Sequence, residues 1–160
     1  MAPILIRPFS EDDVPSLHAV FYSAIHQLAA GYYTPAQLDA WAPADRDMAQ
    51  WRERILGIKP YVAEIDGQIA GYADLQANGY IDHFFVSGGF GRRGVGTALM
   101  NHLLAEAAAR QIPELTSDVS LAAEAFFQSF GFEVETRQAV AVRGVVLHNA
   151  KMRKRLSAGV

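Results

Sequence analysis

The sequence predicts a mixed α/β domain in which a mostly antiparallel central sheet is flanked by helices. The turn dipeptides Asp66-Gly67 and Asn78-Gly79 separate runs of strand composition, which indicates an antiparallel meander. Apolar residues recur at helical spacing on both sides of this meander, following Ser10 and Gly94. A third turn at Arg143-Gly144 predicts a terminal hairpin. The expected order of elements is βααβββαβαββ.

The first sixty residues are expected to form one strand and then helices. Ile4–Phe9 has strand composition, and Ser10 with the acids behind it suits the start of a helix, which Gly31 ends. Thr34-Pro35-Ala36-Gln37 is a capping box with proline at the first helical position, so a second, shorter helix is predicted there. The polar stretch that follows leads through Trp51 and indicates more helix.

The rest of the chain is expected to alternate between strands and helices. Strands are predicted at Tyr61–Ile65, Gln68–Gln76, Tyr80–Val86 and Leu115–Val119, and in the hairpin Phe132–Val142 with Val145–Met152. Helices are predicted from Gly94 to about Gln111 and at Leu121–Phe130, with Pro113 and Gly131 as the stop signals.

Composition narrows the class of protein. The 160 residues suit a single domain over 1–160, and 51% hydrophobic residues can form a real core. Zero cysteines exclude disulfides, thiolate metal sites and a cysteine nucleophile. A net charge of -3 argues against nucleic acid as a partner, and no apolar run is long enough for a membrane span or a signal peptide. We therefore expect a cytoplasmic protein.

A glycine-rich string, Gly89-Phe90-Gly91-Arg92-Arg93-Gly94, follows a predicted strand and precedes a predicted helix. Taken alone it is the dinucleotide-binding fingerprint, but that fingerprint belongs to the first strand of a wound parallel sheet, and an antiparallel hairpin precedes it here. Shifted to Arg92–Thr97, the string places glycines and successive N–H groups at a helix start, which suits an anion cradle. Two arginines beside the cradle favour a pyrophosphate and a further phosphate, the anionic outline of coenzyme A, over a solvated glycine turn.

Two signatures resemble those of the GCN5-related N-acetyltransferase (GNAT) family and, with the element order, extend the resemblance over nearly the whole chain. The first is Ile81-Asp82-His83-Phe84-Phe85-Val86-Ser87 through Arg93-Gly94-Val95-Gly96-Thr97-Ala98-Leu99. The second is Ser120-x-x-Ala123-x-x-Phe126-Phe127-x-x-x-Gly131-Phe132. Within the family, the chain looks most like a bacterial subgroup of small domains with Tyr-Thr-Pro near Trp-Ala-Pro. It departs from the pattern at Gly91, where a glutamine or arginine is usual, and at Phe127, where many members have a tyrosine that protonates the departing thiolate.

The resemblance implies transfer of an acetyl group from acetyl-CoA, as co-substrate and without a metal, to a primary amine by direct attack in a ternary complex. It implies that Arg92, Arg93, Gly94, Val95, Gly96 and Thr97 cradle the pyrophosphate, that Phe85 and Val86 hold the pantetheine and acetyl group, and that Ser120 and Phe127 line the cofactor arm. It also implies that the backbone N–H of Val86 polarises the thioester carbonyl, as an oxyanion hole does.

Three side chains are candidates for work on the acceptor amine. Strand alternation places Asp82 on the same face as Val86 and His83 on the opposite face, so Asp82 is the candidate base. Asp118 is another candidate base, and the alternative role for Asp82 is to pair with an arginine. The resemblance places the first two helices over the acceptor pocket and so makes Tyr22 a further catalytic candidate. Alternatively, Tyr22 belongs to a stripe of side chains on the first helix at the boundary of the core and has no catalytic role.

Four residues are candidates for substrate contact: His26, Tyr33, Trp41 and His83. Tyr32, Tyr33 and Trp41 could form an aromatic wall for a cationic or apolar substrate, or simply pack two short helices together. The acceptor itself stays open between a small-molecule amine and a protein amine.

Two other functions are rivals to the transferase. One is a non-catalytic acyl-CoA binding module, which the missing tyrosine at Phe127 suggests. The other is a nicotinamide-dependent enzyme built on the glycine string. A homodimer is permitted by the exposed strand edge expected near the carboxyl terminus.

Overall fold

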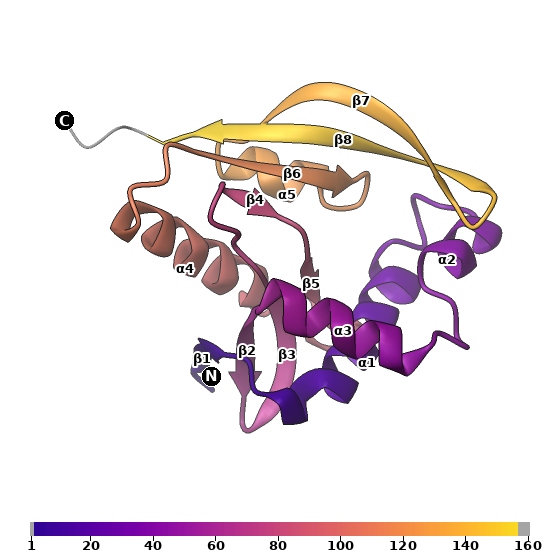
Figure 1. Cartoon of the computed structure of the whole chain (residues 1–160), viewed down its shortest axis with the longest axis horizontal. Helices are drawn as coiled ribbons and strands as arrows, with labels where there is room; N and C mark the ends of the chain where they lie inside the picture. The colour runs from indigo at the N-terminus through magenta and orange to yellow at the C-terminus, as the bar shows by residue number, and fades with distance from the viewer. Residues whose placement is uncertain (1, 157–160) are drawn as a thin grey trace.

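The computed structural model describes residues 2–156 and contains two four-stranded sheets (Figure 1). The first has the order β1-β2-β3-β5, and its adjacent strands are antiparallel. The second has the order β4-β6-β8-β7 and includes one parallel pair, β4 with β6. The strands are β1 (Ile4–Pro8), β2 (Tyr61–Ile65), β3 (Gln68–Ala73), β4 (Tyr80–Ile81), β5 (Phe84–Val86), β6 (Glu114–Ser120), β7 (Glu133–Val142) and β8 (Val145–Arg155).

The helices lie mostly in the first half of the chain; they cover both faces of the first sheet, and two of the shorter ones contact strands of the second sheet. They are η1 (Glu11–Asp13), α1 (Val14–Ser23), η2 (Ala24–Leu28), α2 (Pro35–Trp41), α3 (Met48–Ile58), η3 (Gly88–Phe90), α4 (Val95–Ala109) and α5 (Glu124–Ser129). The predicted fold class is confirmed, with α3 as a separate element in the stretch where more helix was expected. The predicted capping box is also confirmed: Gln37 N–H donates to Thr34 Oγ1 at 3.2 Å, and Thr34 N–H donates to Gln37 Oε1 at 2.9 Å.

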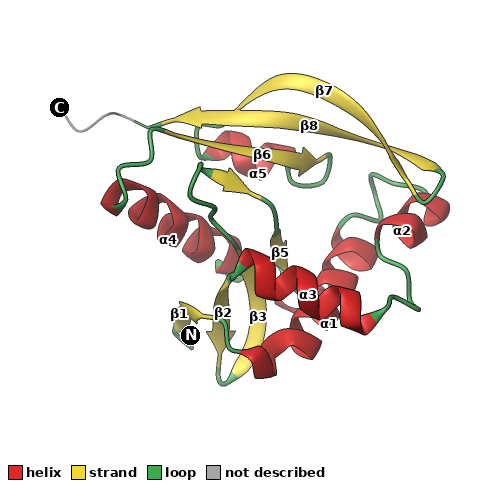
Figure 2. Cartoon of the chain, viewed as in Figure 1, coloured by secondary structure: helices red, strands yellow, loops and turns green. Residues whose placement is uncertain are grey.

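The first sheet is buried on both faces (Figure 2). Side chains alternate along its strands, so Ala63 on β2 contributes to the core with α4, and Val62 contributes to the core with α1 and α3. Trp51 of α3 is fully buried in the core that the sheet forms with α1 and α3, and its indole N–H donates to Val14 O at 3.0 Å. Helices α1 and α3 are therefore fixed against the face of the sheet from which Tyr72 projects.

The prediction of one continuous strand at Tyr80–Val86 is wrong. Its two ends belong to different sheets, and Asp82 and His83 lie between them. The buried carboxylate of Asp74 accounts for the break, because its Oδ1 accepts the N–H groups of Asp82 (2.9 Å) and His83 (2.6 Å). These two donors point at a side chain instead of a neighbouring strand. β3 accordingly ends at Ala73, earlier than predicted.

The terminal hairpin of β7 and β8 is confirmed, and β8 continues to Arg155, beyond its predicted end. Arg153 lies within the strand and forms ion pairs with Glu114 and Glu135. Among residues 2–156, no helix combines the length and apolar character needed to cross a membrane.

Candidate active site

Two cavities lie side by side around β5. The large cavity, about 950 Å³, is lined by residues from α1, α2, α3, β5, β6 and the β7–β8 hairpin. The small cavity, about 200 Å³, is lined by residues from η2, β5, the start of α4 and the segment from β6 into α5. Trp41, Phe85 and Ser120 line both, so the two cavities meet at these three side chains.

A backbone donor projects from the open edge of β5 into this region. Along an antiparallel strand, successive N–H groups point to opposite sides. Ser87 N–H donates to Ala70 O of β3 at 2.8 Å, and Val86 lies opposite Gly71 in the register. The Val86 N–H therefore points away from β3, toward the side where β6 diverges to pair with β4 (Figure 1). Val86 also lines the small cavity, which makes its N–H available to a group bound there.

The glycine loop turns sharply into α4. Gly94 has φ +82° and Arg92 has φ +61°, and the side chains of Arg92 and Arg93 are exposed. The first helical hydrogen bond is that of Ala98 N–H to Gly94 O at 3.0 Å. The N–H groups of Val95, Gly96 and Thr97 precede it, at the end of the helix that carries the positive end of the dipole. The loop is anchored behind by Gly88 N–H, which donates to the side chain of Ser23 at 2.7 Å.

The close approach at Gly96 shapes the small cavity. A Cβ on Gly96 would lie 3.2 Å from Phe126 Cζ and 3.8 Å from Val86 Cγ2, so a side chain there would narrow the cavity between β5 and α5. The surrounding side chains are almost all apolar. A narrow apolar passage that starts at a helix N-terminus and ends at a backbone donor fits an acylated pantetheine arm with its phosphates at the helix.

The assignment of Phe127 to the cofactor arm is not what the structure shows. Phe127 is 2% exposed and packs against Phe84, Phe126 and Phe132 in the core, and it lines neither cavity. The neighbouring Phe126 lines the small cavity instead. The reason is helical rotation: adjacent residues of α5 point about 100° apart, so only one of the two rings faces the passage.

Aromatic side chains form one wall of the large cavity. Tyr33 and Trp41 meet edge to face with ring centroids 5.6 Å apart, and Trp41 lies 6.1 Å from Phe85. The Tyr33 hydroxyl donates to His148 O (2.7 Å) and accepts from Leu121 N–H (2.9 Å), which holds the segment before α2 against the β7–β8 hairpin and the loop after β6. Of the three predicted wall residues, Tyr33 and Trp41 thus line the cavity, whereas Tyr32 is exposed and lines neither cavity. Tyr33 also has a clear structural role.

The break between β4 and β5 places Asp82 and His83 together on the large cavity. The alternation that set them on opposite faces is therefore wrong, because the strand is interrupted where they lie. The Asp82 carboxylate pairs with Arg54 of α3 at 2.5 Å. His83 is buried, its Nδ1 lies 2.9 Å from the Tyr72 hydroxyl, and burial lowers its pKa to about 3, so the imidazole is neutral at pH 7.

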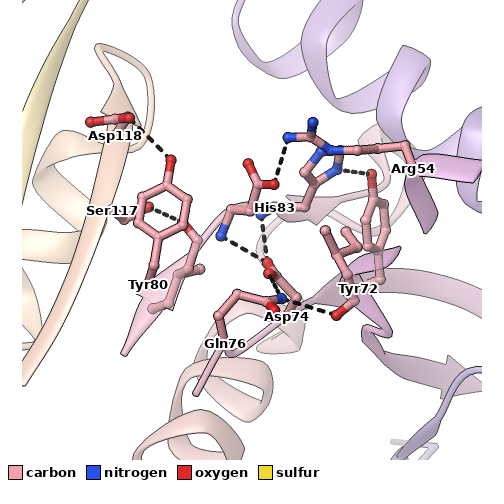
Figure 3. A network of polar contacts seen from close by, with 11 residues as sticks. Arg54, Tyr72, Asp74, Gln76, Tyr80, His83, Ser117 and Asp118 are labelled. Carbon is pink, nitrogen blue, oxygen red and sulfur yellow. Dashed lines mark hydrogen bonds and ion pairs between the residues drawn. The ribbon is translucent and has the colours of Figure 1, made fainter. Parts of the chain in front are cut away.

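Asp74 holds this arrangement from below (Figure 3). Besides the two backbone donors, its carboxylate accepts Gln76 Nε2 at 2.6 Å, and Gln76 in turn donates to Ile58 O at 3.1 Å. Burial raises the pKa of Asp74 to about 6 despite these hydrogen bonds. Nothing in the sequence distinguished this aspartate from an ordinary polar residue after a strand.

The other sequence candidates are divided between the cavity and its surroundings. Asp118 on β6 lines the large cavity, where its carboxylate accepts the Tyr80 hydroxyl and Gln138 Nε2, each at 3.0 Å. Tyr22 and His26 line neither cavity. Their rings stack with centroids 4.1 Å apart, and His26 Nε2 donates to Ala42 O at 2.7 Å, which fixes the segment after α2.

Three arginines of the large cavity were not among the predicted site residues: Arg46, Arg54 and Arg143. Arg143 was interpreted as a turn residue, and its φ of +49° confirms the turn while its side chain reaches Ala40 O at 2.8 Å. Arg46 and Arg54 lie in a polar stretch whose periodicity indicated only helix.

Comparison with known proteins agrees with what the fold and site define, an acetyltransferase domain. The model of the acetyltransferase (GNAT) domain matches residues 29–156, and the chain belongs to the GNAT family. It is thereby an acetyl-CoA-dependent N-acetyltransferase. The nicotinamide interpretation is not favoured, nor is the non-catalytic module.

Individual relatives share nearly the full length of the chain. The uncharacterized N-acetyltransferase YafP of Escherichia coli (strain K12) is 35% identical over 96% of this chain and 97% of its own. A GCN5-related N-acetyltransferase from Rhodopseudomonas palustris, whose crystal structure is also described as an aminotransferase of class II, is 34% identical with a TM-score of 0.92 over 98% of each chain. The PaiA N-acetyltransferase of Thermoplasma acidophilum, solved with coenzyme A, shares the fold at 16% identity, with a TM-score of 0.76 over 96% of this chain and 99% of its own.

Proposed function

We propose that the protein binds acetyl-CoA in the small cavity and an amine in the large cavity, and that the amine attacks the thioester directly where the two cavities meet. The observation that carries this proposal is the shared wall of Trp41, Phe85 and Ser120 beside the open edge of β5. Two substrates bound on either side of that wall reach each other without an acetylated protein intermediate. Acetyl-CoA supplies the activated acyl group.

The cofactor side rests mainly on backbone atoms. The N–H groups of Arg92–Thr97 and the two exposed arginine side chains would hold the pyrophosphate and a further phosphate. Phe85, Val86 and Phe126 would enclose the pantetheine end, with Ser120 at the junction. The CoA-bound Thermoplasma acidophilum structure supports the choice of ligand for this fold.

The Val86 N–H supplies the electrostatic part of the chemistry. As the amine attacks, negative charge develops on the thioester oxygen, and a preorganised backbone donor stabilises that charge. The leaving thiol has an ordinary pKa of about 8.5, so it departs as a thiolate without needing full protonation. Phe127, buried and without a hydroxyl, takes no part, and Ser120, which lines both cavities, would bring a hydroxyl to their junction.

The amine must lose a proton before it attacks, because an alkylammonium has a pKa of about 10.4. We assign this proton to Asp82, directly or through a water molecule, because its carboxylate lines the large cavity next to the break that leads into β5. Asp118 is the second candidate on the opposite wall. The neutral imidazole of His83 shapes the cavity beneath Asp82.

An initial-rate experiment tests the proposal. Thiol release from acetyl-CoA is followed against pooled primary amines, with a no-amine control, and then as a function of both substrate concentrations for an active pool. We expect release only with amine and double-reciprocal lines that intersect. Parallel lines, or acetyl groups covalently bound to the protein when amine is omitted, would contradict direct attack. No release with any amine, while CoA still binds, would favour the non-catalytic module.

A further inference from the structure

The large cavity is lined by three arginines and three carboxylates, but among residues 2–156 only one ion pair forms between them. Arg54 pairs with Asp82, but Arg46 and Arg143 form no ion pair among residues 2–156. The carboxylates Asp82 and Asp118 that line the same cavity accept hydrogen bonds from Arg54, Tyr80 and Gln138, and Glu53 is exposed at its rim. Two guanidinium groups from distant parts of the chain are therefore left without a counter-ion in one cavity.

Arg46 is held in place before any ligand binds. Its guanidinium carbon lies 5.0 Å from the ring centroid of Phe21 and 5.4 Å from that of Trp51. Nη2 donates to Trp41 O at 3.1 Å, and Nε is buried without a hydrogen-bond partner. A guanidinium has five N–H donors, so most of the donors of Arg46 remain for a ligand.

Arg143 reaches the same region from a different part of the chain. It lies in the β7–β8 turn, and its Nη1 donates to Ala40 O at 2.8 Å, so it contacts the same end of α2 as Arg46 does. The carbonyl groups at this helix end attract cations, which accounts for one hydrogen bond from each arginine. The attraction of the helix end does not explain why two like charges lie near one cavity. Burial lowers the pKa of Arg46, and the positive charge of the nearby Arg143 lowers it further. The pair is costly unless an anion joins it.

We propose that the acceptor amine carries an anionic group, a carboxylate or a similar oxyanion, which Arg46 and Arg143 bind while the amine faces the Asp82 side near Phe85 and Ser120. This inference rests on the proposed function and names its substrate class, a small amino acid or an acidic amine. Guanidinium groups bind carboxylates through paired N–H···O hydrogen bonds and discriminate strongly against neutral groups. A lysine side chain within a protein has no such anion at a fixed distance from its amine.

Matched acceptors test this inference. Amino acids and their carboxamides are offered separately in the thiol-release assay; the carboxamide keeps the size and an amine that loses its proton more readily. We expect kcat/KM for the acids to exceed that for the amides by at least about tenfold, the scale of one charged hydrogen bond. Arg46→Gln and Arg143→Gln should each reduce this ratio toward 1, mainly by raising KM for the acids. Arg46→Lys should retain part of it.

Arg52→Gln is the control, because Arg52 is an exposed arginine of α3 that pairs with Glu11 and lines neither cavity. Calorimetric binding of N-acetylated amino acids and of their amides provides a second readout, in which only the acids should bind and only Arg46 and Arg143 should matter. Turnover of amides equal to or better than that of acids overturns the inference and leaves the transferase intact. Absence of turnover with either pool, with CoA bound normally, overturns both.

Discussion

The two cavities are built in different ways. The small cavity uses backbone groups and apolar side chains that come mainly from three short segments, within residues 24–29, 84–86 and 120–126, together with Gly96 at the start of α4. The large cavity uses charged and aromatic side chains from six elements spread between Phe21 and Asn149. A ligand common to a whole family can be bound by a local backbone motif, whereas the acceptor is selected by long-range placement of side chains. Substitutions in one cavity should therefore change cofactor binding without changing acceptor selection, and substitutions in the other should do the reverse.

The largest effect is expected on the cofactor side. Gly94→Asp places a carboxylate beside the N–H groups that would hold the pyrophosphate, where like charges about 4 Å apart repel by about 4 kcal/mol at an effective dielectric constant of ~20. CoA affinity should fall by about 100-fold or more in a calorimetric titration. Gly94→Asn is the matched control, because asparagine tolerates the positive φ of +82° as well as aspartate does. Equal loss in both variants would indicate backbone strain instead of charge.

On the acceptor side, Asp82→Asn should leave CoA affinity unchanged and slow the reaction. A positioned base contributes on the order of 100-fold or more, and the deficit should shrink as rising pH deprotonates the amine in solution. Asp118→Asn is the comparison on the opposite wall. A pH–rate profile of kcat/KM decides between them: a normal rate for Asp82→Asn at neutral pH, with a slow Asp118→Asn, would move the proton transfer to Asp118.

The free energy of unfolding should depend on pH through two buried groups beneath the acceptor cavity, His83 and Asp74. The pKa of His83 is lowered to about 3, so acidification below about 6.5 favours the unfolded state, which binds the proton. The pKa of Asp74 is raised to about 6, so the folded state binds its proton first and acidification from pH 6 toward 4 favours folding. The two effects oppose each other in that range.

Asp74→Asn removes the second effect and also the hydrogen bond from Gln76 Nε2, whose loss lowers stability at every pH and leaves the slope unchanged. Its free energy of unfolding should therefore fall more steeply than that of the wild type between pH 6 and 4, by up to about 1.4 kcal/mol per pH unit. Urea unfolding at each pH measures the difference between the two curves. Parallel curves would mean that Asp74 titrates in the folded protein as it does in the unfolded chain.

The smallest effect separates the two phenylalanines of α5. Phe127→Tyr, which restores the residue type usual in the family, should give no gain in kcat and should destabilise the fold by about 1–3 kcal/mol, because its hydroxyl is buried among Phe84 and Phe132. Phe126→Tyr introduces the same hydroxyl at the small cavity and should be tolerated. Thermal unfolding and steady-state rates compare the two. A faster Phe127→Tyr enzyme would show that its ring reaches the thiol.

The same contrast explains which parts of the site could be predicted. Val86 and the loop Arg92–Thr97 are contiguous and need glycines and a strand end, so their pattern is visible in sequence. Arg46 and Arg143 come together only when the β7–β8 turn reaches α2, and no local pattern encodes that contact. The strand break was missed because a buried carboxylate, Asp74, replaces strand partners with side-chain hydrogen bonds.

Positions within short or interrupted elements were the other source of error. The six-residue helix α5 sets Phe126 and not Phe127 toward the small cavity, and a shift of one residue in such a helix is invisible to spacing alone. Alternation failed at Asp82 and His83 for a similar reason, since it assumes a continuous strand. Fold class, by contrast, depends on many turns and apolar periods together and tolerates such local errors.

One measurement tests the central claim, that the acetyl group lies at the open edge of β5 with the phosphates at the start of α4. Backbone amide spectra of the ¹⁵N-labelled protein are recorded with CoA and with acetyl-CoA. Both ligands should shift the amides of Arg92–Thr97, and the Val86 amide should move further only when the acetyl group is present. Equal Val86 shifts with both ligands, or acetyl-dependent shifts confined to Arg46 and Arg143, would contradict the account.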